Sequence, residues 1–356
     1  MKWSYLRWCW LVTASSVSLA AADNSPRERA REVDPEVAQI EQLLRPRSLV
    51  GEGKSQAAPA APGPRDMAAQ LKTAAARAKA ARARRSESDP AAPELAKLEA
   101  KALVNAALLG ESSLADQAIK IAGEVRADSR VAKRERFEIA ANAELLRVRK
   151  WHNDMPRLRQ ERIESARSLI REFPEETGGY EALLNEAQNQ DDSAQAAALA
   201  TELITTPSTP EPIKAIAQLL VDRHALVGQS LFTIVSAALG DSSRIDSARG
   251  RPVVLYVWGS WSTGQIDLAK SLGNMPGIAA VGFNIAEDPQ AARAFAAREG
   301  LPGSLLFKDD DYNGDLAKAL TLTVGSPVFI CDSSGAIIDV TGDRGDFKAK
   351  LQRVQR

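Results

Sequence analysis

The sequence predicts a protein of several domains, in which an all-α region precedes an α/β domain. From Glu94 to about Leu226, apolar residues recur every three to four positions without a strand pattern, which is typical of short amphipathic helices. After residue 226, β-branched and aromatic runs alternate with helical patterns, which is typical of an α/β domain. The 356 residues suffice for two or three domains, each with its own core.

The first 22 residues have the form of a secretory signal peptide. Lys2 and Arg7 precede an apolar run from Trp8 to Ala22, which ends in three alanines. We therefore expect a periplasmic or secreted protein with no integral membrane span after cleavage. The alternative is an uncleaved signal anchor in the inner membrane, although the run is short for a span.

Composition excludes several classes of function. The 46 basic and 46 acidic residues balance, so no overall charge favours nucleic acid or an anionic membrane. Two cysteines are too few for a disulfide framework, and because Cys9 lies in the signal segment, the mature chain keeps Cys331. The two histidines, His152 and His224, have no second ligand at metal-binding spacing. We predict no metal site and no cofactor.

Residues 23–92 are predicted to be a low-complexity region rich in alanine, proline and arginine. Pro35 to Leu44 is predicted as a short helix, and Gly51 to Pro64 as a linker with too little apolar surface to fold. Residues 65–85 favour a helix but have almost no large apolar side chains. We interpret them as a solvated spacer; the alternative is a basic contact for an acidic partner or cell-envelope polymer.

We assign residues 93–226 to a helical repeat-like domain. Its short apolar-striped segments, separated by breaks such as Gly110 and Pro174, predict stacked antiparallel hairpins. In helix length and alanine spacing the region resembles tetratricopeptide-type repeats, without their signature residues or a strict period. Such a region either presents a protein-binding surface or serves as a spacer.

The predicted α/β domain, residues 227–356, is organised around Val253–Trp258, an apolar run that suits a strand covered on both faces. A turn of small residues and a helix at Gln265–Leu272 follow it. The remaining predicted elements are strands at Ile278–Ile285, Ser304–Phe307, Val328–Asp332 and Ile337–Val340, and helices at Pro289–Gly300, Leu316–Leu322 and Phe347–Val354.

Two landmarks in this domain carry a family resemblance. Trp261 follows the central strand, and Pro327 opens a later strand, where a proline is tolerated if the preceding bond is cis. The domain resembles the bacterial extracytoplasmic thioredoxin-like (redoxin) family, whose motif reads Trp-Cys-x-x-Cys. Here Ser262 and Gln265 occupy the cysteine positions. The resemblance implies a thioredoxin-like fold, a β-hairpin ahead of the central strand, and a cis Ser326–Pro327 bond facing the turn.

The substitutions argue against thiol chemistry at this turn. Dithiol exchange needs an attacking thiolate and a resolving thiol, and neither Ser262 nor Gln265 supplies one. A nucleophilic serine needs a base, and both histidines lie outside the domain. We therefore interpret Ser262 as a helix cap and predict no catalytic residue.

The leading hypothesis is an exported, redox-inactive thioredoxin-like protein that serves as a protein-binding, peptide-binding or assembly module. The resemblance implies a groove of Trp261, Ser262, Ser326 and Pro327, in which an extended peptide pairs as an added strand. The expected partner is a protein or peptide of the cell envelope.

The alternative is an enzyme, namely a thiol-disulfide oxidoreductase or peroxidase that uses Cys331. Strand alternation places Cys331 on the same face as Phe329 in a sheet covered on both faces, which favours an inert thiol. Reactivity would require an exposed thiol with a lowered pKa. A third hypothesis is that the thioredoxin-like domain is only a folding unit and the helical region binds the partner.

Overall fold

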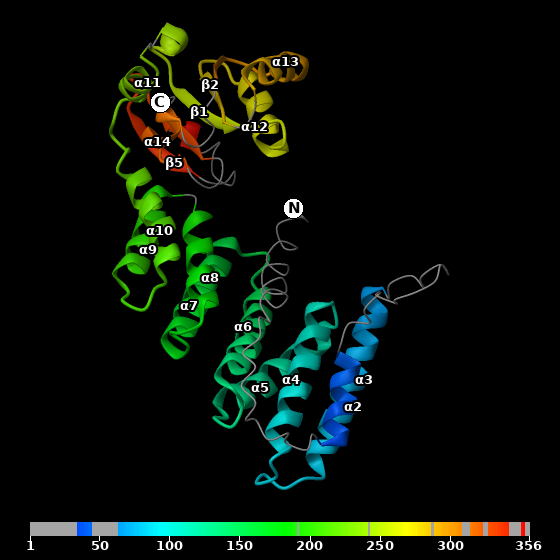
Figure 1. Ribbon diagram of the computed structural model, residues 1–356. Helices are drawn as coiled ribbons and strands as arrows, with labels where there is room; N and C mark the ends of the chain where they lie inside the picture. The colour runs from blue at the N-terminus through cyan, green and yellow to red at the C-terminus, as the bar shows by residue number, and fades with distance from the viewer. Residues whose placement is uncertain are drawn as a thin grey trace. The chain divides into compact units, whose positions relative to one another are not determined.

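The computed structural model describes residues 34–44, 63–190, 192–240, 243–285, 288–307, 314–322, 327–341 and 350–352 (Figure 1). The chain forms two compact units, one up to Gly179 and the other from Tyr180 onward. The predicted signal peptide, most of the predicted linker and Ser326 lie outside the described residues. No helix in the described part combines the length and the hydrophobicity of a membrane span.

The unit up to Gly179, unit 1, is all-helical, as the sequence predicts. From α3 onward, consecutive helices are joined by short connections, and the helices pack against one another through buried alanine, leucine, isoleucine and valine side chains. Its helices are α2 (Pro35–Leu44), α3 (Pro64–Ala83), α4 (Ala92–Leu108), α5 (Ala115–Ala127), α6 (Lys133–Arg149) and α7 (Met155–Glu172), with a short 3₁₀ turn at Ser112–Leu114. Helix α8 (Thr177–Gln188) crosses the boundary between the units.

Helix α3 corrects the interpretation of residues 65–85 as a solvated spacer. Ala74, Ala75, Ala78 and Ala81 recur at helical spacing and are buried in the core that α3 shares with α4. A stripe of alanines lets two helices approach closely, so a helix without large apolar side chains still gains a packed face. Helix propensity and close packing therefore act together here.

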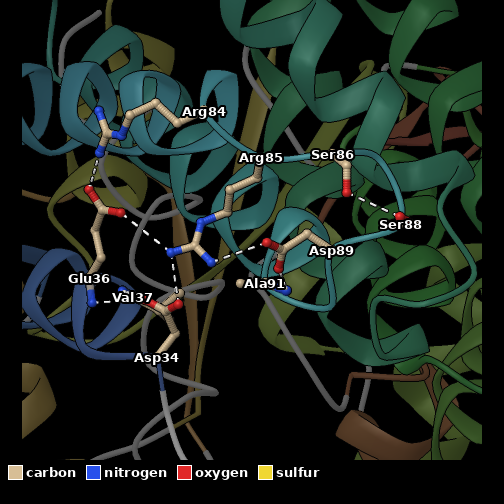
Figure 2. A network of polar contacts seen from close by, with 9 residues as sticks. All are labelled: Asp34, Glu36, Val37, Arg84, Arg85, Ser86, Ser88, Asp89 and Ala91. Carbon is tan, nitrogen blue, oxygen red and sulfur yellow. Dashed lines mark hydrogen bonds and ion pairs between the residues drawn. The ribbon is translucent and has the colours of Figure 1, made fainter.

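The arginines at the end of α3 find acidic partners within the chain. Arg85 lies 2.7 Å from Asp34, 3.4 Å from Glu36 and 3.3 Å from Asp89, and Arg84 also pairs with Glu36 (Figure 2). These ion pairs join α2 to the turn between α3 and α4. The sequence analysis considered an external acidic partner for this basic segment. Arg84 and Arg85 instead pair with acidic residues of the same chain.

The second compact unit, unit 2, combines helices with one five-stranded sheet. Its helices after α8 are α9 (Ser193–Thr205), α10 (Glu211–His224), α11 (Leu231–Leu239), α12 (Thr263–Gly273), α13 (Pro289–Glu299) and α14 (Asp315–Ala319). Its strands are β1 (Val253–Trp258), β2 (Ala279–Asn284), β3 (Ser304–Phe307), β4 (Val328–Cys331) and β5 (Ile337–Thr341). A 3₁₀ helix covers Ser243–Ala248.

The sheet order is β3-β2-β1-β4-β5, with β1 parallel to β2, β2 parallel to β3, and both β4 and β5 antiparallel to their neighbours. All six residues of β1 are buried. Val253, Leu255 and Val257 belong to the core on one face of the sheet, whereas alternate residues such as Tyr256 and Trp258 belong to the other. This is the predicted thioredoxin-like fold, in which helices cover both faces of a mixed sheet.

Residues 231–239 form helix α11, so the predicted β-hairpin ahead of the central strand is wrong. The Ser230 side chain accepts a hydrogen bond from Thr233 N (3.4 Å), and Gly240, with φ of 68°, ends the helix in the left-handed conformation. Leu231 and Val235 lie one helical turn apart and are fully buried. Ser230 itself pairs with Ala336 through one β-bridge.

Helices α9 and α10, at the end of the predicted repeat region, belong to the same unit as the sheet. Both contact strand β5, and Ser193 N donates to Asp339 Oδ1 over 3.4 Å. In α10, Arg223 Nη2 donates to the carbonyl oxygen of Thr321 (2.8 Å). The domain boundaries that we placed at residues 92/93 and 226/227 remain predictions.

Candidate functional site

The candidate site lies where β1 ends and α12 begins. Ser262 N donates to Gly259 O (2.9 Å), which closes a tight turn after the strand. The amides of Gln265 (3.0 Å) and Ile266 (3.2 Å) then donate to Ser262 O and begin the helix. The predicted strand, turn and helix are present, and α12 starts at Thr263, two residues before the predicted start.

Ser262 occupies the N-cap position of α12, but its side chain does not cap the helix. A capping hydroxyl reaches the helix amides from extended backbone, whereas Ser262 has φ of −99° and ψ of 70° and makes no such bond. Its Oγ atom is buried and has no hydrogen-bond partner. The prediction of a capping role is therefore wrong.

Trp261 is the most exposed of the large apolar side chains in the described part of the chain, at 58 %. Its indole ring lies against Gly259, where an added Cβ atom would stand 2.7 Å from the indole Nε1. The glycine thus leaves room for the ring to fold back over the turn. An exposed tryptophan held in this way is a typical apolar anchor for a partner.

Pro327 lies near the same end of the sheet. It is buried and directly precedes β4, whose Val328 pairs with Tyr256 in β1. Continuing this antiparallel register by one residue places Pro327 at the level of Val257, close to where β1 ends. Ser326 is outside the described residues, and so is the Ser326–Pro327 bond. The groove of Trp261, Ser262, Ser326 and Pro327 remains a proposal.

Cys331 lies at the opposite end of β1 from this turn. It pairs with Val253, so the five steps along β1 to Trp258 separate it from the turn by roughly 17 Å at about 3.3 Å per residue. The side chain is fully buried in the same core as Phe329, as strand alternation predicts. Burial, with a contribution from Asp332, raises the pKa of the Cys331 thiol well above its ordinary value.

We expect the Cys331 thiol to resist alkylation in the native protein. At pH 7.5, iodoacetamide should modify it at least about a hundredfold more slowly than in urea, because the thiol is protonated and inaccessible. Mass spectrometry of timed samples measures both rates. Rapid modification of the native protein would instead restore the enzyme hypothesis.

The fold also brings Ser193 and His224 together, a pair that the sequence analysis missed because 31 residues separate them. His224 Nδ1 lies 3.2 Å from Ser193 Oγ. The neighbouring α9 amides are engaged, since Ser193 N donates to Asp339 and the next two amides donate to Asp192. No amide at this helix start is free to stabilise an oxyanion, so the pair serves to hold α9 against α10.

No cluster of three or more potential metal ligands occurs among the described residues. His152 is exposed, and its Nδ1 atom lies 3.2 Å from Arg149 O.

The chain matches no protein-family model, and a comparison with curated proteins gives no match. Solved structures do match its C-terminal part. A thiol-disulfide oxidoreductase from Bacteroides fragilis is 18% identical, with 30% of this chain and 82% of that chain covered and a TM-score of 0.26. A secreted thiol-disulfide isomerase from Corynebacterium glutamicum is also 18% identical, with 31% and 72% covered and a TM-score of 0.25.

These likenesses concern the fold of the C-terminal part. The sheet order and the strand–turn–helix segment define a thioredoxin-like domain.

Proposed function

We propose that the protein is exported and that its thioredoxin-like domain binds a protein or peptide of the cell envelope without thiol chemistry. The observation that carries this proposal is the exposed Trp261 on the tight turn between β1 and α12, a turn that has no cysteine. The remote, buried Cys331 supports it, because a thiol at that position is not available to a substrate at the turn.

The geometry of the turn suits an extended peptide. Trp261 supplies apolar surface, and the α12 N-terminus has no side-chain cap on its first amides. A peptide paired beside Pro327 as an added strand would lie over these groups.

Replacing Trp261 with alanine is expected to abolish most of the binding. Loss of a tryptophan anchor costs about 2 kcal/mol or more, which is a roughly thirtyfold loss of affinity. The stability of the fold should hardly change because the side chain is exposed. Immobilised wild-type and variant proteins, incubated with native envelope extract and compared by quantitative mass spectrometry, measure the effect.

Ile338→Ala provides the matched control, because Ile338 is the other large apolar residue in unit 2 that is exposed, at 41 %, among the described residues. It should leave the captured proteins unchanged. Equal capture by the wild type and Trp261→Ala would refute the hypothesis that the groove around Trp261 binds the partner. The helical region would then be the candidate binding region.

Export rests on the signal-peptide pattern of the first 22 residues. One of the matching solved proteins is itself described as secreted. Cleavage after Ala22 remains a prediction.

A further inference from the structure

The turn between α6 and α7, together with the adjoining helix ends, carries basic side chains that form no direct ion pair. Elsewhere in unit 1 many cations are paired: Arg126 contacts Glu144 and Glu172, and Arg147 contacts Glu144 and Glu161. No carboxylate of the described residues lies within 4.0 Å of Arg149, Lys150 or Arg157. None of these three cations forms a direct ion pair, and the nearby Glu161 carboxylate, which interacts with the charges of Arg157 and Lys150, is bound by Arg147.

The indole of Trp151 fixes two of these cations in place. Arg157 Cζ lies 3.2 Å from the centre of the Trp151 ring, and Lys150 Nζ lies 5.1 Å from it. A cation–π contact orders a side chain but leaves its full positive charge. The third cation, Arg149, donates to Leu108 O (3.3 Å), which joins the corner to the end of α4.

Two exposed apolar side chains border these cations. Leu109 follows α4 and is 38 % exposed, and Met155 begins α7 and is 51 % exposed. The acidic groups nearby are engaged, because Asp154 accepts from Arg157 N (3.1 Å) and Glu161 pairs with Arg147 (2.6 Å). The corner therefore combines apolar contact points with an excess of positive charge.

We propose that this corner, the Trp151 surface, docks an acidic peptide segment of a partner protein that carries an apolar anchor residue. The surface consists of Leu109, Arg149, Lys150, Trp151, Met155 and Arg157. Opposite charges across an interface steer the encounter and set the register. Because stacking on Trp151 already orders Lys150 and Arg157, little side-chain entropy is lost when carboxylates bind them.

The geometry favours a peptide over an anionic membrane. A membrane surface attracts each nearby cation by about 1 kcal/mol, so three cations give only marginal binding. Tryptophans that enter a membrane interface present their ring outward, whereas Trp151 is half-buried beneath Arg157 and its Nε1 atom is buried. Two separate apolar side chains suit one anchor residue of a peptide.

The test uses the full chain and a fluorescein-labelled 14-residue peptide of Asp and Glu around one central Leu. We expect saturable binding at 50 mM salt that weakens severalfold at 200 mM salt. Lys150→Gln with Arg157→Gln should weaken it about five- to tenfold, as for two exposed ion pairs. Met155→Ser should weaken it about fivefold, because it removes an apolar contact. Fluorescence anisotropy measures these affinities.

Lys133→Gln with Arg134→Gln is the matched control, since these cations lie at the other end of α6 and are 43 % and 71 % exposed. This control variant and Trp261→Ala should both bind the acidic peptide with wild-type affinity. The proposal is overturned if the wild type does not bind, if control and test variants lose binding equally, or if Trp261→Ala alone abolishes it. The proposal would also be overturned, in favour of a membrane, if the protein bound phosphatidylserine vesicles more strongly than the peptide and if Lys150→Gln with Arg157→Gln abolished that vesicle binding.

Discussion

Replacing Ser262 and Gln265 with cysteines is expected to give the protein disulfide-reductase activity. The two positions are three residues apart at the first turn of α12, where side chains lie about 5–6 Å apart, within reach of a disulfide. A helix N-terminus and a Cys-x-x-Cys arrangement lower a thiol pKa from about 8.5 to about 7. This shift raises the thiolate fraction at pH 7 about 15-fold.

The measurement is the reduction of insulin by the mature protein in the presence of dithiothreitol, in a Cys331→Ser background. Ser262→Cys alone is the control: it should form a mixed disulfide but not turn over, because it lacks the resolving thiol. Activity in the double variant and none in the wild type would support a binding module with an intact turn.

Either other outcome changes the interpretation. Activity of the wild type that disappears with Cys331→Ser would contradict the redox-inactive proposal. Inactivity of the double variant would mean that the groove has lost the geometry of a thioredoxin-like site, and binding would then be sought in the helical region.

Gly303→Ala is expected to destabilise unit 2 strongly. Gly303 has φ of 83°, and a Cβ atom there would lie 2.0 Å from Ala280 O in β2, so backbone atoms must move. The left-handed conformation costs an alanine about 1–2 kcal/mol, and overpacking adds about 1–3 kcal/mol. We expect a loss of about 3–4 kcal/mol in the free energy of unfolding.

Gly300→Ala is the matched control, with a similar φ of 64° but no atom within 4 Å of the added Cβ. It should lose only the conformational term of about 1 kcal/mol. Urea unfolding of the chain without residues 1–22, in a Trp151→Phe and Trp261→Phe background, leaves Trp258 as the single tryptophan, and its fluorescence reports on unit 2. Equal losses for the two variants would mean that β2 and β3 adjust to the clash.

The strands of the sheet were predictable because a short, continuous run of apolar residues has few alternatives to a buried strand. Val253–Trp258 and Ser304–Phe307 form strands with the predicted bounds. Gly282 in β2 permits close approach, since a Cβ atom there would lie 2.6 Å from Tyr256 Oη. The inert environment of Cys331 also followed from strand alternation. These inferences rest on local patterns that the tertiary structure preserves.

Other features depend on contacts that a sequence pattern does not show. Residues 231–239 combine strand-like and helix-like residues, and burial of Leu231 and Val235 on one side decides for the helix. The alanine face of α3 required knowledge of α4, its packing partner. The Ser262 side chain does not cap α12 because of its backbone conformation, which the sequence does not show. Pairs such as Ser193 and His224 arise only when α9 and α10 pack.

Strand β5 is the last strand of the sheet, yet its outer side is occupied. Ile337 O accepts from Gly228 N (2.7 Å), Ile337 N donates to Gln229 O (2.8 Å), and α9 and α10 contact the strand. A recombination event with its junction just after α10 would keep the two Ile337 hydrogen bonds, but it would separate β5 from α9 and α10 and so bare part of a strand edge that other chains can pair with. The segment from Tyr180 onward is therefore expected to be inherited as one block.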